Sequence, residues 1–410
     1  MSYNFSESQQ KAYDAVQSGK NVFITGSAGN GKSYLTNAVK DKDTAVFAPT
    51  GIAAINVGGV TCHRGFGLPI GIPSEDDFNN IYPKVKKVLR NIDRIIISEI
   101  GMVRTDMLDM INRKLQTAKG SKKPFGGVQM IVEGDFFQLE PIVVGKEQRL
   151  FFDKYDSVFC YSSDNWDFTT CELTHPQRQT NIDHYNLLNR IRIGEDSAVD
   201  ELLSMSKDYE LSPDTLHLCA YNADAGKVNS HWYRQNKEKE HTFYANKWGK
   251  ISERDVIVPE TLKLKVGCKV MLCANDPCGE YVNGGTGVLS HIDKNELVVT
   301  LVGGKEVTVE KFTWQSHGYE SYDGKIHKAV VGAFSQFPVK LGWAVSVHKS
   351  QGITLDDAAI HTGRGMFSHG QFYVAVSRIR DLTRLQFLRK HQVSSNDLIV
   401  KDEVKRFYGY

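Results

Sequence analysis

The segment from Gly26 to Ser33 reads GSAGNGKS, which fits the phosphate-binding pattern G-x-x-x-x-G-K-[ST]. Its glycines let the backbone bend so that several N–H groups point at one anion, at the positive end of the helix that follows. In this pattern Lys32 holds the β- and γ-phosphates of a nucleotide, and the hydroxyl of Ser33 binds Mg²⁺. The residues expected to bind nucleotide are therefore Gly26, Ser27, Ala28, Gly29, Asn30, Gly31, Lys32 and Ser33. The alternative is a glycine-rich turn with a chance lysine, and the pattern alone does not separate kinases, GTPases and motors.

A second polar segment could supply the groups that act on a bound nucleotide. The apolar run Ile95–Ile97 is followed by Ser98 and Glu99. A motor needs one carboxylate to activate the attacking water and another to position Mg²⁺. Glu99 can be the water-activating base, although a solvated carboxylate in a turn is the alternative. Ser98 stands where the metal-side aspartate would be, and a serine would hold Mg²⁺ more weakly, as a neutral ligand or through water.

The elements that must position these residues alternate between strands and helices in the first half of the chain. Apolar runs predict strands at 22–25, 45–48, 95–97 and 128–132, with helical stretches between them, for example 107–118. Ser6 and Gln9 form a capping box that opens the first helix. This alternation is typical of a parallel α/β sheet, which binds ligands at the carboxyl ends of its strands.

Each half of the chain carries an insertion that interrupts this alternation. Residues 62–90 contain three prolines and an acidic cluster, which indicates a small insertion. The α/β pattern restarts near residue 185 with a helix through Leu187 and Ile191, followed by a strand at 216–220. Between 250 and 312, short apolar runs separated by glycine turns predict a small β-barrel inserted into the second α/β unit.

Composition limits the partners and the compartment. The chain has 410 residues, a net charge of +2 and seven scattered cysteines. A nucleic-acid site would therefore be a local groove and not a wholly basic surface. No run of about 18 apolar residues appears and the N-terminus lacks a secretion signal, so we expect an intracellular protein without a membrane span. The cysteines lack the paired spacing of common zinc sites, so we interpret them as structural thiols.

Further motifs follow in a fixed order along the chain. They are Ala48–Ala54 with Thr61-Cys62-His63, Pro124–Gln129 with Gly134–Leu139, Arg178-Gln179, Leu341–Gly352 and Gln371–Arg378. Together with the phosphate loop, these motifs resemble the Pif-type helicases, relatives of RecD in group B of helicase superfamily 1. The resemblance extends over nearly the whole chain.

The resemblance implies roles for individual residues around the nucleotide. Gln9 would read adenine, and Gln138 would sense the γ-phosphate. Arg178 and Arg378 would place cations on the γ-phosphate, where such an arginine is worth roughly 10³–10⁵ in rate. Gln351 and Gly352 would complete the nucleotide site. Taken without the resemblance, the arginines could form surface ion pairs of little value.

The resemblance also implies a DNA groove across both lobes, of the kind that follows the backbone of a single strand without reading sequence. Its expected residues are Pro49, Thr50, Gly51, His63, Phe66, His348, Lys349 and Ser350. Phe66 could stack on bases, and Trp343 could either stack or belong to the core. Three departures from the family pattern stand out: Ser98 in place of aspartate, Glu140 in place of proline, and His175-Pro176-Gln177 before Arg178.

We therefore expect an α/β protein with two RecA-like lobes. Lobe one covers 1–180 with a small insertion at about 64–90, lobe two covers 181–249 and 335–410, and an SH3-like β-barrel covers 250–334. The resemblance implies an ATP- and Mg²⁺-dependent DNA helicase that moves 5′ to 3′ on single-stranded DNA. It further implies unwinding of partial duplexes, forks and G-quadruplexes by a monomer, with roles in DNA repair, recombination and telomere maintenance. The compartment would be the cytoplasm of a bacterial or phage-infected cell, or the nucleus or mitochondrion of a eukaryote.

Two alternatives to a helicase stay open. An ATP-binding clamp on single-stranded DNA would hydrolyse ATP poorly because Ser98 weakens Mg²⁺ binding. A P-loop kinase would instead transfer phosphate to a small molecule.

Overall fold

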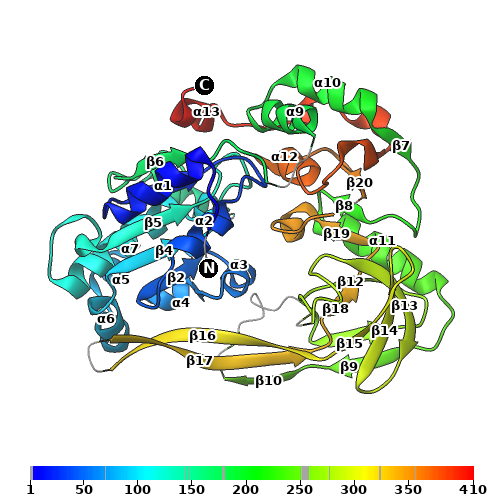
Figure 1. Cartoon of the computed structure of the whole chain (residues 1–410), viewed down its shortest axis with the longest axis horizontal. Helices are drawn as coiled ribbons and strands as arrows, with labels where there is room; N and C mark the ends of the chain where they lie inside the picture. The colour runs from blue at the N-terminus through cyan, green and yellow to red at the C-terminus, as the bar shows by residue number, and fades with distance from the viewer. Residues whose placement is uncertain are drawn as a thin grey trace.

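The computed structural model describes residues 3–69, 71–143, 145, 147–177, 181–249, 251, 258–276, 278–322, 325–355 and 357–410. Two parallel sheets form two α/β lobes, and an antiparallel insertion projects from the second lobe (Figure 1). The expected two-lobed α/β fold with an inserted β-domain is confirmed. No helix in the described ranges is long and apolar enough to cross a membrane.

The sheet of lobe one has six strands in the order β3-β2-β4-β5-β1-β6, and all neighbouring strands are parallel. The strands are β1 (Val22–Thr25), β2 (Thr44–Ala48), β3 (Val60–Thr61), β4 (Arg94–Ile97), β5 (Gln129–Glu133) and β6 (Thr169–Glu172). The four strands predicted from apolar runs are present. The edge strands β3 and β6 were missed because β3 is only two residues long and β6, with the sequence TTCE, has no apolar run.

The helices of lobe one cover both faces of this sheet. They are α1 (Glu7–Gln17), α2 (Lys32–Val39), α3 (Gly51–Asn56), α4 (Cys62–Phe66), α5 (Glu75–Asn79), α6 (Pro83–Arg90), α7 (Thr105–Lys119) and α8 (Glu147–Phe152). Helix α1 begins with the predicted capping box, because the Gln9 side chain accepts from the Ser6 N–H at 3.0 Å. The three short helices α4, α5 and α6 occupy the region expected to be a small insertion.

The sheet of lobe two has five parallel strands in the order β19-β8-β20-β21-β7. They are β7 (Lys207–Tyr209), β8 (His217–Cys219), β19 (Ala344–Ser346), β20 (Ala358–His361) and β21 (Leu385–Leu388). The main helices are α9 (Ile182–Arg192), α10 (Asp196–Met205), α11 (Asn222–Gln235) and α12 (Gln371–Val376). The predicted helix near Leu187 and the predicted strand at 216–220 correspond to α9 and β8.

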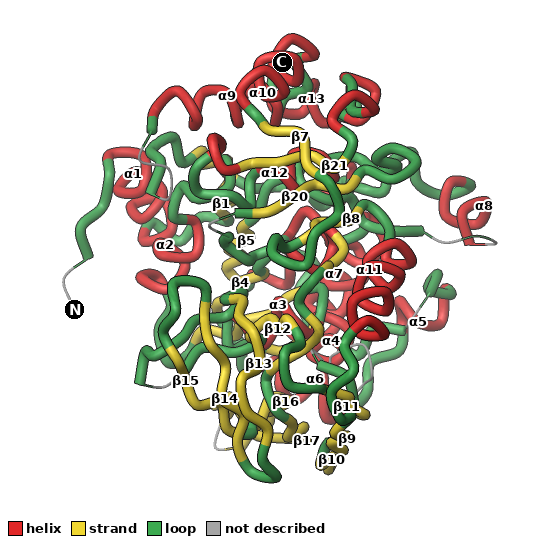
Figure 2. The backbone as a smooth tube through the Cα atoms, turned by 90° about the vertical axis from the view of Figure 1, so that its right-hand side faces the viewer, coloured by secondary structure: helices red, strands yellow, loops and turns green. Residues whose placement is uncertain are grey.

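The insertion is a curved antiparallel sheet of five strands in the order β15-β14-β13-β12-β18. These strands are β12 (Lys269–Leu272), β13 (Thr286–Ile292), β14 (Glu296–Leu301), β15 (Glu306–Glu310) and β18 (Val339–Leu341), and they enclose their own apolar core. Figure 2 shows them below the strands of lobe two. Strands β9 (His241–Tyr244) and β11 (Thr261–Leu264) pair beside this sheet. Strands β9, β10 (Asn246–Gly249) and β18 lie outside the range 250–334 but pair with strands inside it.

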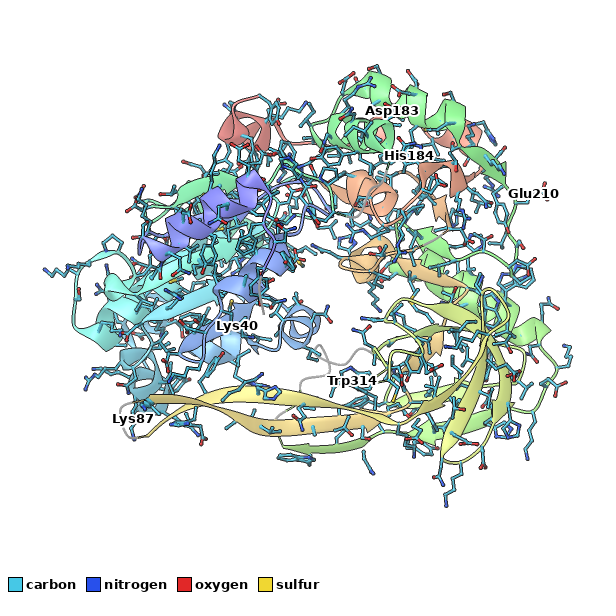
Figure 3. The ribbon with its side chains drawn as sticks, in the orientation of Figure 1. Lys40, Lys87, Asp183, His184, Glu210 and Trp314 are labelled. Atoms are coloured by element: carbon cyan, nitrogen blue, oxygen red, sulfur yellow. The ribbon has the colours of Figure 1, made fainter. Side chains whose placement is uncertain are left out.

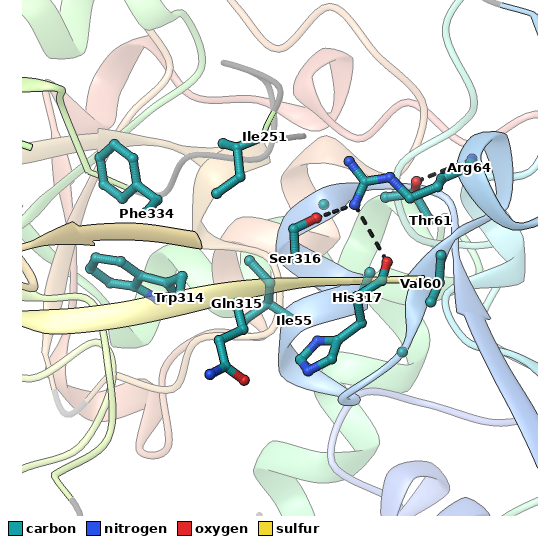
Figure 4. A pocket seen from close by; sticks show the side chains of 13 residues that line it. Ile55, Val60, Thr61, Arg64, Ile251, Trp314, Gln315, Ser316, His317 and Phe334 are labelled. Atoms are coloured by element: carbon teal, nitrogen blue, oxygen red, sulfur yellow. Dashed lines mark hydrogen bonds between the residues drawn. The ribbon is translucent and has the colours of Figure 1, made fainter. Parts of the chain in front are cut away.

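A long hairpin of β16 (Phe312–Tyr322) and β17 (Lys325–Gln336) crosses from the insertion to lobe one. In Figure 3, Trp314 marks its end near the insertion and Lys87 of α6 lies beside its far end. The hydroxyl of Tyr319 accepts from the Val46 N–H at 2.8 Å, and Glu320 pairs with Lys84 at 2.7 Å. The guanidinium of Arg64 donates to the hydroxyl of Ser316 (Figure 4). The sequence predicted the insertion but not its return to lobe one.

The C-terminal helix α13 (Asp402–Tyr408) also packs on lobe one, although the chain enters it from lobe two. The ring of Phe407 stacks on Tyr161 with centroids 4.2 Å apart. The hydroxyl of Tyr408 lies 2.7 Å from the Thr25 hydroxyl, at the end of β1. The two lobes are therefore joined by the C-terminal segment as well as by the chain between β6 and α9.

Candidate functional site

The phosphate loop joins β1 to α2 at the carboxyl edge of the first sheet, and its backbone has the bent form that an anion cradle requires. Gly26, Gly29 and Gly31 have φ values of 136°, 89° and 79°, which favour glycine. A Cβ on Gly31 would lie 2.6 Å from the side-chain nitrogen of Gln9, so glycine is also required for close approach. The Lys32 ammonium donates to the carbonyl oxygens of Gly26 and Ser27 at 2.6 and 3.1 Å. These features fit a triphosphate, whose oxygens would accept from the loop N–H groups and from Lys32.

Side chains from lobe two hold this loop in place. The amide of Asn30 donates to the Leu173 carbonyl at 2.5 Å and to the Tyr185 hydroxyl at 3.1 Å. The Tyr373 hydroxyl accepts from the Ala28 N–H at 2.9 Å, and the Ser27 hydroxyl donates to Asn189. Tyr185 and Asn189 lie on α9, and Tyr373 lies on α12. Sequence reasoning missed these contacts because they join residues between 143 and 345 positions apart.

Gln9 lies beside the phosphate loop, against Gly31. Its side chain is 1% exposed, and its nitrogen has no hydrogen-bond partner among the described residues. A buried donor without an acceptor is costly and needs an explanation. A purine base offers ring-nitrogen acceptors, so this orphaned amide fits the adenine-reading role expected for Gln9.

Glu99 follows β4 in a left-handed conformation with φ of 56°. Burial and the nearby Glu133 carboxylate raise the pKa of Glu99 to about 7, although the charges of Lys32 and Arg378 oppose this. The amide of Gln351 donates to Glu99 at 3.2 Å and to Gln138 at 3.3 Å. A residue of lobe two therefore connects the expected base to the expected γ-phosphate sensor. A carboxylate with a pKa near neutrality is suited to accept a proton from water.

Ser98 is buried at the end of β4, and its hydroxyl donates to the carboxylate of Glu133 at the end of β5. Asp135, two residues further on, is instead paired with Arg192, whose guanidinium donates to it at 2.9–3.2 Å. No group of three or more His, Cys, Asp or Glu side chains in the described part of the chain could hold a metal ion by itself. A cation here would thus depend on nucleotide phosphates in addition to Ser33 and the carboxylates.

The structure places one of the two expected arginines, Arg378, at the boundary between the lobes. Arg378 lies just after α12, is 2% exposed, and donates to the Val374 carbonyl at 2.9 Å and to the Ser377 hydroxyl at 2.8 Å. Its charge acts on Glu99 across the lobe boundary. Arg178 lies outside the described residues. Lys32 and Glu99 thus come from lobe one and Arg378 from lobe two, which is the division expected of a nucleotide site between lobes.

A cleft of about 700 Å³ connects the two groups of expected functional residues. Its lining from lobe one includes Ser33, Lys40, Thr50, Asn56, Ser98 and Glu99, and from lobe two Tyr221, Asn222, His348, Lys349, Gln351, Gly352 and Phe367. A second cleft of about 680 Å³ shares Asn56, Asn222, Lys349, Gln351 and Gly352 with it and reaches Lys263, Asn283 and Lys340 of the insertion and its flanks. The cleft that holds the nucleotide-side residues therefore adjoins a second cleft that carries lysines of lobe two and of the insertion.

Two residues expected to contact DNA are fully buried, and both expectations are corrected. Phe66 is fully buried and packs on Phe47 with ring centroids 4.5 Å apart, so it is a core residue. Ser350 is also fully buried, and its hydroxyl donates to the Val347 carbonyl at 2.8 Å. Trp343 belongs to a core cluster as well. Apolar or hydroxyl character alone does not show which side chains face solvent.

The other expected DNA-binding residues lie at different places. The Thr50 hydroxyl accepts from the Ala53 N–H at 3.2 Å as the cap of α3, and Pro49 precedes it. Gly51 is buried beside the crossing hairpin. His63 lies on α4, outside the lining of either cleft. His348 and Lys349 line the first cleft.

Phe367 is an aromatic residue of the cleft that sequence reasoning missed. It is 52% exposed and stacks on Tyr221 with centroids 4.7 Å apart. It also faces His348 at 6.0 Å, and burial lowers the pKa of that histidine. A single phenylalanine between polar residues gives no sequence signal for this position.

Comparisons with known proteins find one family over most of the chain. The sequence model of the PIF1-like helicase family matches residues 4–198. The chain is 33% identical to the ATP-dependent DNA helicase PIF1 of Xenopus laevis over 93% of this chain and 61% of that protein. It is 32% identical to the ATP-dependent DNA helicase Pif1 of Bdellovibrio bacteriovorus over 98% of this chain and 91% of that protein. It therefore spans about three fifths of the vertebrate relative's length and nearly all of the bacterial one.

Solved structures of a Bacteroides Pif1 are also similar. The complex with ADP-AlF4 matches with a TM-score of 0.89 and 34% identity over 99% of this chain and 97% of that one. A complex of Pif1 helicase from Bacteroides with ADP-AlF3 and ssDNA matches with a TM-score of 0.71 and 35% identity, again over 99% and 97%. The likeness thus covers both lobes and the insertion.

Proposed function

The chain belongs to the PIF1-like helicase family, and from this membership we propose that it is an ATP-dependent DNA helicase that moves on single-stranded DNA. The observation that carries the proposal is the cleft that Ser33, Ser98 and Glu99 share with Thr50, His348, Lys349 and Phe367. Nucleotide chemistry and a DNA path in one cleft between two lobes are what a motor needs.

In this proposal each polar group has one task. Lys32 and the loop N–H groups bind the phosphates, and Gln9 binds the adenine. Mg²⁺ held at Ser33 would offset phosphate charge during hydrolysis. Glu99 accepts the proton of the attacking water, and Arg178 and Arg378 place positive charge beside the γ-phosphate.

Coupling to DNA would use the contacts that already join the lobes. Gln351 links Glu99 and Gln138 to the segment that carries His348 and Lys349. A change in the nucleotide that alters the position of Gln351 therefore also moves the two DNA-facing residues. Lys349 would contact phosphates, and Phe367 would offer an aromatic face on which any base can stack.

The proposed substrates are single-stranded DNA joined to duplex or forked DNA, with movement from 5′ to 3′. Binding of G-quadruplexes, action as a monomer, and the implied roles in repair, recombination and telomere maintenance belong to the same proposal. The Bacteroides complex with ssDNA and the family names support the DNA part of it. The domain limits at about 180, 250 and 334 are also part of it, with β9, β10 and β18 as flanking strands that pair with the insertion.

The rival proposal is a DNA clamp that binds ATP but hydrolyses it poorly, which Ser98 would favour. The experiment that separates them is Mg²⁺-dependent ATP hydrolysis with and without single-stranded DNA, alongside displacement of a labelled strand from duplexes with a 5′ or a 3′ tail. A helicase is stimulated by DNA and opens the 5′-tailed duplex, whereas Lys32→Ala abolishes both activities. Tight DNA binding in ATP without stimulated hydrolysis would establish the clamp instead.

A further inference from the structure

We propose that Glu133 supplies the metal-side carboxylate of the nucleotide site, with Ser98 as the residue that positions it. This inference rests on the proposed function, because it requires a nucleotide and a divalent cation at the phosphate loop. The carboxylate that a motor would carry at the end of β4 has, in this chain, moved to the end of the neighbouring strand β5.

Strand register places Glu133 where such a carboxylate is needed. Strands β4 and β5 are parallel neighbours, and Ile97 pairs with Val132, so Ser98 and Glu133 leave the sheet side by side. On its other side Glu133 pairs with Ile24 of β1, the strand that leads into the phosphate loop. Glu133 thus stands between the strand that carries Ser98 and Glu99 and the strand that carries the loop.

The surroundings of Glu133 favour a bound cation. The side chain is 4% exposed, and the described residues give it one hydrogen bond, from Ser98, and no ion pair. Burying a carboxylate without a paired cation is costly. The charge of Lys32 acts on it, but the Lys32 ammonium is bound to the Gly26 and Ser27 carbonyls. A divalent ion bound by Glu133 would compensate this buried charge.

The other two carboxylates at this edge of the sheet have different partners. Asp135 is fully buried and is neutralised by the guanidinium of Arg192. Glu99 accepts from Gln351 and is the proposed base. Glu133 is therefore the carboxylate left for the metal, and the Ser98 hydroxyl fixes its orientation as partners of metal ligands commonly do.

The test measures metal binding directly. Mn²⁺ replaces Mg²⁺ because its binding can be followed by electron paramagnetic resonance, and ADP is the nucleotide. The variants are Glu133→Gln, which keeps shape and removes charge, and the swap Ser98→Asp/Glu133→Ser, which returns the carboxylate to β4. The control is Glu172→Gln, which removes a half-exposed carboxylate from the end of edge strand β6 of the same sheet. Binding of a fluorescent ADP in EDTA is measured for each.

We expect Glu133→Gln to weaken Mn²⁺ binding in the presence of ADP by about 10- to 100-fold. The swap should recover most of that loss, and Glu172→Gln should bind Mn²⁺ as the wild type does. ADP binding in EDTA should stay within about twofold for all variants. The proposal is overturned if Glu133→Gln binds Mn²⁺ as well as the control, or if it loses ADP binding in EDTA by the same factor.

The outcome is separable from that of the helicase proposal. DNA-stimulated hydrolysis by the wild type is read in its own assay, without reference to Mn²⁺ affinity. If stimulation is absent while Glu133→Gln still loses Mn²⁺, the helicase proposal fails and the metal assignment stands. If stimulation is present while Mn²⁺ binding is unaffected, the assignment of Glu133 fails alone.

Discussion

The buried pair of Arg192 and Asp135 is expected to hold the two lobes together, and Arg192→Met tests this. Arg192 ends α9, whose apolar face packs in the core of lobe two. Asp135 follows β5 of lobe one. Their side chains are 2% and 0% exposed. Methionine keeps the apolar stem of the side chain but removes the guanidinium.

The expected cost follows from burial and geometry. The guanidinium donates to both oxygens of Asp135, at 3.2, 3.0 and 2.9 Å, and lies 4.6 Å from the Phe137 ring centroid and 5.2 Å from that of Tyr408. Breaking a buried pair from one side costs about 3–5 kcal/mol, because the remaining charge is left uncompensated. Each desolvated cation–π contact adds roughly 0.5–2 kcal/mol. We therefore expect a loss of at least about 3 kcal/mol.

Arg190→Met is the matched control, since Arg190 lies on the same helix but its side chain is 35% exposed and pairs with Glu195 and Glu201 at the surface. Exposed pairs contribute about 0–1 kcal/mol. Hydrogen exchange of α9 and of the segment after β5 is the assay, because it reports local opening. A cost of about 3–5 kcal/mol corresponds to roughly two to four orders of magnitude faster exchange, and the control should change by less than about tenfold.

A second variant guards against a purely steric effect. Arg192→Met/Asp135→Asn removes both charges, so part of the lost protection should return in a double-mutant cycle. Equal exchange in Arg192→Met and Arg190→Met would refute the idea that this pair joins the lobes. Failure of Asp135→Asn to recover any protection would show that the loss came from packing.

Three further predictions concern the nucleotide site and the DNA groove. Because the pKa of Glu99 is raised to about 7, ATP hydrolysis should rise about tenfold between roughly pH 6 and 8 as the base loses its proton, and a flat profile would exclude this role. Because the pKa of Glu99 is raised, the folded protein keeps a proton on Glu99 that the unfolded chain releases above pH 4.5. The free energy of unfolding should therefore fall as pH rises from 4.5 to about 7. Denaturant titration should show this fall in the wild type but not in Glu99→Gln. Lys349→Ala should weaken binding of single-stranded DNA and reduce the slope of log affinity against log salt by about 0.7. Fluorescence anisotropy measures both quantities. The control variant Lys294→Ala, in the turn after β13, should change neither the affinity for single-stranded DNA nor its salt dependence. An equal loss of affinity in both variants would contradict a specific contact of Lys349 with DNA.

The sequence by itself determined the chemistry of the nucleotide site. The phosphate loop, the strands around it and the position of Glu99 were predicted because each is encoded locally, by a fixed glycine spacing, by apolar runs and by the polar residues that follow one of them. The role of Gln138 was expected from the family resemblance. Parallel strands bring their carboxyl ends to one edge, so separate polar segments could be placed in one site without coordinates. Arg178, which lies outside the described residues, stays a prediction.

Only the tertiary structure decided which side chains face the cleft and which partner each one has. Phe66 and Ser350 carried the right chemistry for DNA but are buried, since local pattern does not separate an exposed face from a packed one. Glu133 lies beside Ser98, 35 residues away in the sequence, because of the register between β4 and β5. The contact of Tyr319 in the hairpin with Val46 joins residues 273 positions apart. The contact of Tyr373 in α12 with Ala28 in the phosphate loop joins residues 345 positions apart. Such pairings depend on how whole elements pack, and no periodicity within a single segment records them.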